Sequence, residues 1–187
     1  MRSLFILSIF LFFLGCSRPV EAPHLASAFD ATLTDIDGKP HPLAQHRGKV
    51  VMVVNVASQC GYTGQYAGLE ALYLERKDRG LVVIGVPSND FGVFSGQEPG
   101  EDAEIKKFCS LTYGVTFPMM TKVKVSGDQA DPFYRWLITR PGSGAVSWNF
   151  NKYLIGRDGT TIRRFGSSTA PNDKELIGAI DAALAQP

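Results

Sequence analysis

The sequence predicts an α/β domain built on a central mixed β-sheet with helices on both faces. Two apolar runs rich in β-branched residues, Val50–Val56 and Leu81–Pro87, lack polar alternation and match strands that are covered on both faces. Between them, Tyr66–Arg79 has apolar residues at helical spacing and is followed by a glycine, which predicts a helix. A strand, a helix and a strand in this order predict a parallel βαβ unit.

Length and composition are those of one globular domain. The chain has 187 residues, of which 44% are hydrophobic, and can therefore bury one core. Its 19 lysines and arginines nearly balance its 18 aspartates and glutamates, and no basic run or basic helix face is found. Nucleic acid is therefore a poor candidate partner.

The N-terminal segment has the pattern of an export signal. Arg2 precedes the apolar stretch Leu4–Leu14, which has the length of a signal-peptide hydrophobic region and is too short to span a bilayer. The stretch ends in "FLGC", which resembles the bacterial lipobox. We therefore expect residues 1–15 to be removed and Cys16 to be acylated, the alternative being an ordinary cleaved signal whose cysteine is incidental.

The residues after Cys16 suggest where the protein is held. The signal predicts export to the periplasm, and Ser17, rather than aspartate, follows the cysteine, which favours a lipid anchor in the outer membrane. Residues 16–28 contain prolines and small residues without periodicity, so they predict a tether between the anchor and the domain. The domain is expected to cover residues 29–187.

The remaining segments complete the sheet and its helices. Residues 29–43 alternate around Asp37-Gly38 and predict an N-terminal hairpin, and residues 151–165 predict a second hairpin around Asp158-Gly159. Helices are predicted over 100–114, 131–139 and 172–185, a short strand after Met120, and a loop over 140–147. Together these elements predict a thioredoxin-like fold.

Cys60 lies where the run Val50–Val56 ends and small and polar residues begin. The carboxyl end of a buried strand is where open α/β sheets bind ligands, and the N–H groups that start the next helix favour an anion such as a thiolate. A reactive thiol is therefore one interpretation. The other is a small buried apolar residue, since free cysteines are among the most buried residue types.

Four segments of the chain resemble the glutathione peroxidase family. "NVASQCGYTGQY", Asn55–Tyr66, resembles the active-site stretch, with Cys60 where some members carry selenocysteine. The others follow in the family's order and are "PSNDFG" with "GQEPG" (87–100), "YGVTFPMM" (113–120) and "WNFNKYLIGRDG" (148–159). Because they span nearly all of the chain after the tether, the sequence is identified as a member of this family.

The resemblance implies a thiol peroxidase that reduces hydrogen peroxide and organic or lipid hydroperoxides without a cofactor. In the family a thiolate attacks the peroxide oxygen, an alcohol or water leaves, and the sulfur becomes a sulfenic acid. Cys60 matches this peroxidatic position. Trp148 and Asn149, which would otherwise be interpreted as a core aromatic and a turn residue, match an indole and an amide that donate hydrogen bonds to the sulfur and the developing oxyanion.

Asp90 is the main departure from the family pattern, which has glutamine at this catalytic position. Glutamine donates an N–H, whereas an ionised aspartate only accepts and would repel a thiolate. Three arrangements are open: a retuned site, an aspartate held protonated, or an aspartate turned away with water in its place. Ser88 also stands where many cysteine-type relatives have an additional cysteine.

Cys109 is the second candidate thiol. It lies on an apolar face of the predicted helix 100–114, which we expect to carry an Asp102–Lys106 pair, so core packing is one interpretation. Its place between "GQEPG" and "YGVTFP" matches the resolving cysteine of the thioredoxin-dependent branch of the family. The resemblance then implies a disulfide with Cys60, for which the helix would have to unwind.

The resemblance also suggests the reductant and the oligomeric state. Only a short loop separates Trp136 from Trp148, whereas tetrameric selenium-type members carry a longer insertion there that contributes to assembly and to the glutathione site. We therefore expect a monomer recycled by a thioredoxin-like protein, with glutathione as the second candidate. His24, His41 and His46 form no ligand motif, so we expect surface positions and no metal.

Two other functions have to be weighed against the peroxidase. A thiol–disulfide carrier on the same fold normally needs two cysteines two residues apart, which "CGYTG" does not offer. A non-catalytic lipoprotein that uses the fold for protein contacts draws some support from Asp90. Peroxide-dependent loss of two thiols per molecule would distinguish the peroxidase from both.

Overall fold

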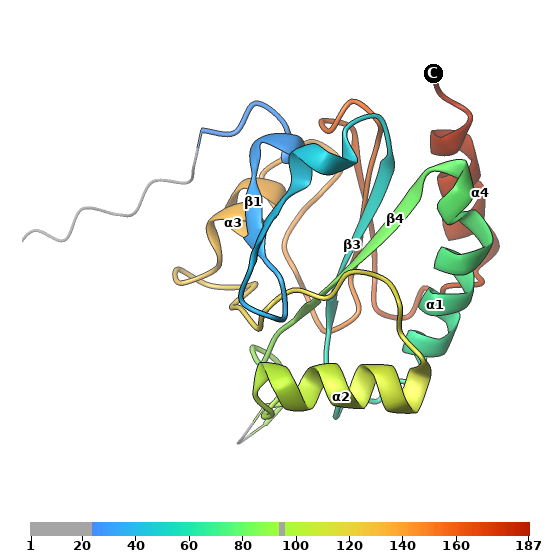
Figure 1. The fold of residues 1–187 in the computed structure, drawn as a ribbon. Coiled ribbons are helices and arrows are strands. Elements are labelled where there is room, and N and C mark those ends of the chain that lie inside the picture. Colours follow the sequence, from blue (N-terminus) through green and yellow to red (C-terminus); the bar gives the residue numbers. More distant parts are fainter. Residues whose placement is uncertain (1–23, 94–95) are drawn as a thin grey trace, which may run out of the picture.

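The computed structural model describes residues 24–93 and 96–187 and confirms the predicted α/β architecture (Figure 1). Its main sheet has the strand order β4-β3-β5-β6, in which β3 and β4 are parallel and the other neighbours antiparallel. These strands are β3 (Val50–Val56), β4 (Leu81–Pro87), β5 (Lys152–Ile155) and β6 (Ile162–Phe165). The predicted mixed sheet is therefore present. The predicted signal peptide and Cys16 lie outside the described residues.

The predicted N-terminal hairpin forms a separate two-stranded sheet of β1 (Thr32–Thr34) and β2 (Pro40–Pro42). The α-helices are α1 (Gln65–Arg76), α2 (Asp102–Tyr113), α3 (Pro132–Leu137) and α4 (Lys174–Leu184). Short 3₁₀ turns are η1 (Ala28–Asp30), η2 (Leu43–His46) and η3 (Lys77–Arg79). No helix in the described part of the chain is long and apolar enough to cross a bilayer.

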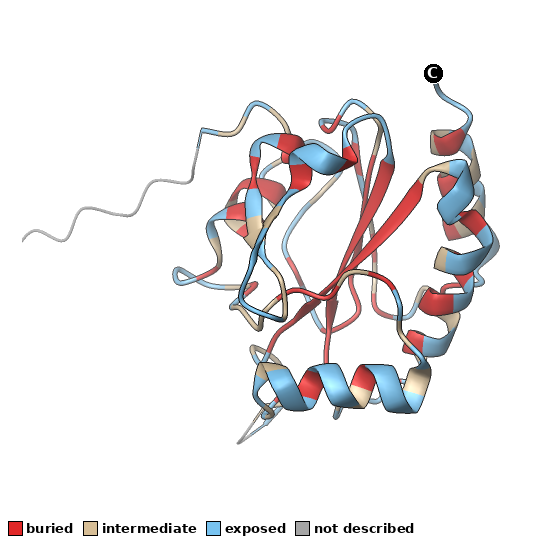
Figure 2. Ribbon diagram, in the orientation of Figure 1, coloured by how far each residue is buried: buried red, intermediate tan, exposed pale blue. Residues whose placement is uncertain are grey.

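Helices cover both faces of the main sheet. In Figure 1, α1 and α4 lie on one side of β3 and β4, and α3 lies on the other side with the β1–β2 hairpin. All seven residues of β3 and all seven of β4 are buried, so both strands are drawn red in Figure 2. This two-sided burial explains why their sequences lack polar alternation.

Helix α2 lies across the end of the sheet toward which β3 runs (Figure 1). Its first turn is capped by Glu101 and Glu104, which bond each other's main chain, and it ends at Gly114 in the left-handed conformation (φ 62°). Ile105 and Cys109 are its buried residues and join the apolar cluster beneath α1 and α4. The helix therefore brings Cys109 to the edge of the sheet where the loop of Cys60 begins.

The short strand predicted after Met120 is wrong. Thr121 donates its main-chain N–H to the carbonyl of Thr34 in β1, and Val123 donates to that of Pro87 in β4, both at 3.0 Å. The intervening Lys122 donates to a carboxylate of Asp102 (2.9 Å), and Val125 donates to Asp90 (2.6 Å). Because successive N–H groups bond two different strands and two carboxylates, no continuous ladder with one strand forms. The segment is irregular and is held by side chains that are distant in sequence.

The end of the predicted tether is part of the folded body. The indole Nε1 of Trp136 donates a hydrogen bond to the carbonyl of Leu25 at 2.8 Å, and Ala28 is buried. The chain therefore packs against α3 a few residues before the predicted boundary at Phe29.

Candidate active site

Cys60 lies in the loop that joins β3 to α1 and is half-buried. The loop is closed by Thr63, whose Oγ1 accepts from the Cys60 N–H at 2.9 Å and donates to the carbonyl of Ala57 at 2.9 Å. The Tyr62 N–H donates to the Cys60 sulfur at 3.4 Å. The sequence suggested that N–H groups at the start of the helix would face the sulfur. Because α1 begins only at Gln65, the observed donor belongs instead to the turn before the helix.

Asn55, which is buried in β3, fixes the segment that carries Trp148 and Asn149. Its Nδ2 donates to the carbonyl of Trp148 at 3.0 Å, and its Oδ1 accepts from the N–H of Asn151 at 3.1 Å. Between them, Phe150 has φ 62°, which is uncommon for a residue with a side chain. Such a conformation persists only where surrounding contacts impose it, so the Asn55 bonds and the burial of Phe150 hold this turn in shape.

Trp148 is partly exposed, at 38% of its surface, and packs against Phe91 with ring centroids 5.6 Å apart. Phe91 follows Asp90 in the loop after β4. The indole of Trp148 therefore lies at the surface, and Phe91 of the "PSNDFG" segment packs against it.

Asn149 is fully buried, and its Nδ2 donates to Oε1 of Gln97 at 2.7 Å. Its Oδ1 has no hydrogen-bond partner among the described residues. The carbonyl of Gln97 in turn accepts from the N–H of Gln59 at 2.9 Å, next to Cys60. Gln97 therefore connects the cysteine loop to Asn149.

Asp90 faces a different part of the molecule. One carboxylate oxygen accepts from the N–H of Val125 (2.6 Å), the N–H of Ser126 (2.8 Å) and the hydroxyl of Ser126 (3.0 Å). Of the three arrangements open from the sequence, these bonds favour an aspartate that is turned away from the sulfur. At this position the side chain anchors the turn at residues 125–126.

Glu98 is fully buried and contacts the loop that carries Cys60. Its Oε1 accepts from the hydroxyl of Ser58, and its N–H donates to Oδ1 of Asn89 at 2.6 Å. Burial raises the pKa of Glu98, so this carboxyl holds its proton more readily than a glutamate in water does. A buried carboxyl thus links the residues just before Cys60 to the segment that leads into α2.

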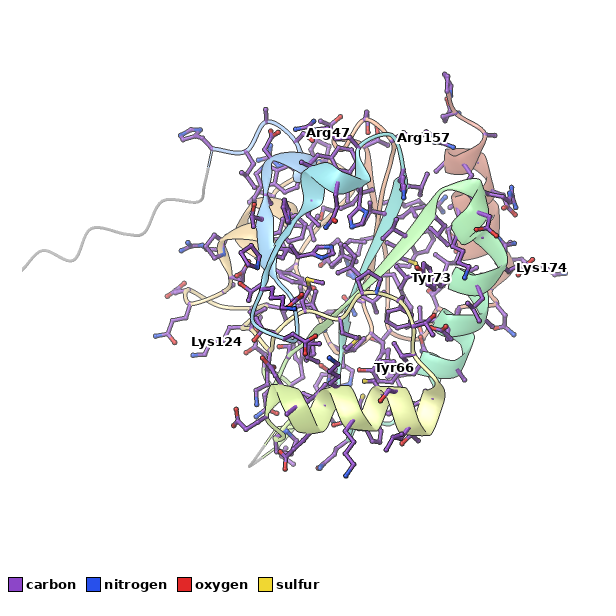
Figure 3. The ribbon with its side chains drawn as sticks, viewed as in Figure 1. Arg47, Tyr66, Tyr73, Lys124, Arg157 and Lys174 are labelled. Carbon is purple, nitrogen blue, oxygen red and sulfur yellow. The ribbon has the colours of Figure 1, made fainter. Side chains whose placement is uncertain are left out.

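Cys109 is buried in α2 with 1% of its surface exposed, and both thiols are free. Burial raises the pKa of the Cys109 thiol to about 11, and the hydroxyl of Tyr66 lies beside it. Tyr66 sits near the start of α1, between that helix and α2 (Figure 3). Cys60 packs against the same apolar cluster that contains Cys109. The two thiols are therefore on one side of the sheet, and Cys109 is shielded from solvent.

The histidines differ from expectation at one position. His46 is buried and its Nε2 lies 3.0 Å from Nε2 of His41, whereas His24 is exposed. Burial lowers the pKa of His46 to about 4, so this pair is neutral near pH 7. No group of three or more His, Cys, Asp or Glu side chains within residues 24–93 and 96–187 could hold a metal ion.

Sequence reasoning missed the roles of Gln97, Glu98 and Thr63. All three stand inside the quoted motifs, so the signal was present, but each contacts partners that are distant in the chain or that depend on the shape of the loop. Gln97 meets Asn149 across 52 residues, and Glu98 meets Ser58 across 40. Only the folded sheet brings these segments together.

The chain is similar in sequence to proteins of one known family. A family model described as glutathione peroxidase matches residues 28–138. A glutathione peroxidase-like peroxiredoxin of Schizosaccharomyces pombe is 47% identical over 150 residues, which cover 79% of this chain and 93% of that protein. The thioredoxin/glutathione peroxidase BtuE of Escherichia coli is 38% identical over 183 residues, with 86% and 98% covered.

Solved structures of related proteins have a similar fold. The crystal structure of Trgpx in apo form superposes with a TM-score of 0.68 at 40% identity and covers 86% of this chain and 97% of that one. A thiol:disulfide interchange protein of the thioredoxin family from Chlorobium tepidum superposes with a TM-score of 0.62 at 20% identity, covering 90% and 99%. The second likeness concerns the fold alone, and it confirms the predicted thioredoxin-like type.

Proposed function

Because this chain belongs to the glutathione peroxidase family and is a thiol peroxidase, we propose that Cys60 is the thiol that reacts with the hydroperoxide. The Cys60 thiolate attacks the terminal peroxide oxygen, and the O–O bond breaks. The sulfur becomes a sulfenic acid, and the departing alkoxide or hydroxide takes a proton and leaves as alcohol or water. The peroxide gains two electrons and the sulfur loses them.

The observation that carries this assignment is the joining of the Cys60 loop to Asn149 through Gln97. Gln59, next to Cys60, donates to the Gln97 carbonyl, and the Gln97 side chain accepts from Asn149. An amide held at this place is suited to donate to a sulfur anion or to the oxygen that departs. Trp148, one residue before Asn149 and partly exposed, can close the site on the solvent side.

The second step we assign to Cys109. Its thiol displaces the hydroxyl of the Cys60 sulfenic acid, the S–S bond forms, and water leaves. Cys109 is buried in α2, so the helix must open locally before the two sulfur atoms can meet. A dithiol reductant then reduces the disulfide and restores both thiols.

A single-turnover experiment tests these assignments. The reduced protein is mixed with hydrogen peroxide, a small organic peroxide or a lipid hydroperoxide, and remaining thiols and peptide masses are measured. We expect two thiols to be lost per peroxide and a Cys60–Cys109 disulfide to form. Cys60→Ser should abolish the reaction, whereas the matched variant Cys16→Ser should leave it unchanged. Normal turnover in Cys60→Ser would refute the mechanism.

We also propose a monomer that is recycled by a thioredoxin-like protein, with glutathione as the alternative reductant. Support comes from the short connection between α3 and Trp148, where the chain has no long insertion, and from the name of the Escherichia coli relative, which includes both reductants. Thioredoxin and glutathione, tested in parallel on the oxidised protein, would distinguish the two.

Membrane attachment is a further part of this proposal. Arg2, the apolar stretch Leu4–Leu14 and "FLGC" support export and acylation at Cys16, with the domain facing the periplasm from the outer membrane. Intact-mass analysis of membrane-extracted protein should give a chain that begins at Cys16 and carries acyl mass. A soluble chain cleaved elsewhere would contradict it.

A further inference from the structure

The loop that follows β4 contacts both predicted donor residues of the site. At its start, Phe91 packs against the indole of Trp148, and near its end Gln97 bonds the amide of Asn149. Asp90, which stands at the family's glutamine position, is instead bonded to the turn at residues 125–126. The loop therefore holds Trp148 and Asn149 through residues other than the expected one.

Gln97 is bonded to two segments at once. Its carbonyl accepts from the N–H of Gln59 and its Oε1 accepts from Nδ2 of Asn149, at 2.9 and 2.7 Å. The first contact ties it to the residue before Cys60, and the second ties it to the buried amide. The distance between the cysteine loop and Asn149 therefore depends on Gln97.

Asn149 has few other groups that could orient its amide. It is fully buried, and its Oδ1 has no hydrogen-bond partner in the described part of the chain. A primary amide has two N–H donors. When Oε1 of Gln97 takes one of them, the rotation of the amide is fixed, and one N–H remains for another acceptor.

The loop leaves room for this side chain at Gly92. Gly92 has φ 104°, and a Cβ at this position would lie 2.6 Å from Cγ of Gln97. Any larger residue at position 92 would thus displace the Gln97 side chain. The positive φ also disfavours residues other than glycine.

We propose that Gln97 is a positioning residue for peroxide reduction, which orients the amide of Asn149 toward Cys60 in a site where Asp90 does not supply the family's donor. The inference rests on the proposed function of Cys60 and Asn149. Gln97 acts through Asn149 and not on the peroxide itself.

A double-mutant cycle tests this coupling. Gln97→Met keeps the length of the side chain and removes the acceptor, and it is made alone and together with Asn149→Ala. The readouts are the second-order rate of thiol oxidation by hydrogen peroxide and the pH dependence of Cys60 alkylation by iodoacetamide. We expect Gln97→Met to slow oxidation about tenfold or more alone, and about twofold or less in the Asn149→Ala background. The alkylation profile should move to higher pH only when Asn149 is present.

Equal losses in both backgrounds would overturn the proposal, because Gln97 would then act independently of Asn149. Normal rates in Gln97→Met alone would overturn it as well. Gln186→Leu, at an exposed position near the C-terminus, is the matched control and should behave as the wild type. Gly92→Ala provides a second route, since it displaces Gln97 without removing its amide, and the same non-additivity with Asn149→Ala is expected.

Failure of the proposed function gives a different result. If peroxide oxidises wild-type protein and Cys60→Ser at the same rate, Cys60 is not the peroxidatic thiol. The alkylation profile would still report whether Gln97 and Asn149 are coupled at Cys60, because it does not require peroxide.

Discussion

The ammonium group of Lys106 lies 2.6 Å from Oδ1 of Asp37, so an ion pair joins the helix that carries Cys109 to the N-terminal hairpin. The Asp102–Lys106 pair expected from the sequence is not formed, because Asp102 bonds Thr121 and Lys122 instead. Asp37 and Lys106 line one cleft between the hairpin and α2, and Cys109 lies buried in its wall. The Lys106–Asp37 ion pair therefore holds α2 against the hairpin, and it must break if this part of the helix unwinds.

Lys106→Ala should speed disulfide formation without affecting the first oxidation step. Both partners are about half exposed, so the pair is screened and the acceleration should be about fivefold or less. Rapid mixing with peroxide, followed by quenching and mass analysis, separates sulfenic acid from disulfide. Lys107→Ala, on the exposed side of α2, is the control and should leave both steps unchanged.

Cys109 should be unreactive in the folded, reduced protein. Burial raises the pKa of its thiol to about 11, so only about one molecule in a thousand carries the thiolate at pH 8. Iodoacetamide should therefore label Cys60 and leave Cys109 unlabelled, whereas both should be labelled in denaturant. Peptide mapping after short exposure at pH 8 measures this directly. Equal labelling of both thiols in the folded state would show that α2 already opens in the reduced protein.

Cys109→Ser should stop the cycle after its first step. The variant is expected to consume one equivalent of peroxide and then to retain a sulfenic acid at Cys60, because no thiol is left to displace its hydroxyl. Trapping with dimedone and mass analysis detects the intermediate. Continued turnover with thioredoxin would mean that an external thiol resolves Cys60 directly.

Asp90→Ala should affect stability more than reactivity. The substitution leaves the N–H groups of Val125 and Ser126 without their acceptor, which costs about 1–3 kcal/mol of unfolding free energy. The rate of thiol oxidation should change about threefold or less, since the carboxylate faces the 125–126 turn. Urea unfolding and single-turnover kinetics measure the two effects. A large acceleration without loss of stability would instead support repulsion between Asp90 and the sulfur.

Lys152 should make stability depend on pH in the alkaline range. It is fully buried in β5, and its ammonium donates to Gln65 and to the carbonyl of Thr169. Burial lowers its pKa from 10.5 to about 7. Between these values the unfolded chain binds more protons than the folded one. The unfolding free energy should therefore rise as pH increases from about 7 to 10, and this gain is lost when pH is lowered to about 7.

Comparison with Lys152→Met isolates this contribution from other groups that titrate at alkaline pH. The variant should lack the rise, whose upper limit is about 5 kcal/mol from the two pKa values of 10.5 and about 7. Urea unfolding at several pH values between 6.5 and 10 measures the difference. Parallel curves for the two proteins would contradict the prediction.

The sequence alone determined the elements whose pattern is local. The bounds of β3 and β4 follow from apolar runs, and α2 follows from helical spacing that stops at a glycine, so all three were predicted closely. The strand expected after Met120 is absent, because the N–H groups of this segment are divided among β1, β4 and the carboxylates of Asp102 and Asp90, all far away in the chain. Local periodicity contains no information about such partners.

Motif resemblance also picked out the candidate site residues, because cysteine, tryptophan and asparagine in these contexts are recognised by type and order. Only the tertiary structure decided what each side chain contacts. It turned Asp90 toward residues 125–126, placed Gln97 between Cys60 and Asn149, and gave Lys106 the partner Asp37. These contacts join segments brought together by the packing of the sheet, and hydrogen bonds depend on distances of a few tenths of an ångström that a linear pattern does not specify.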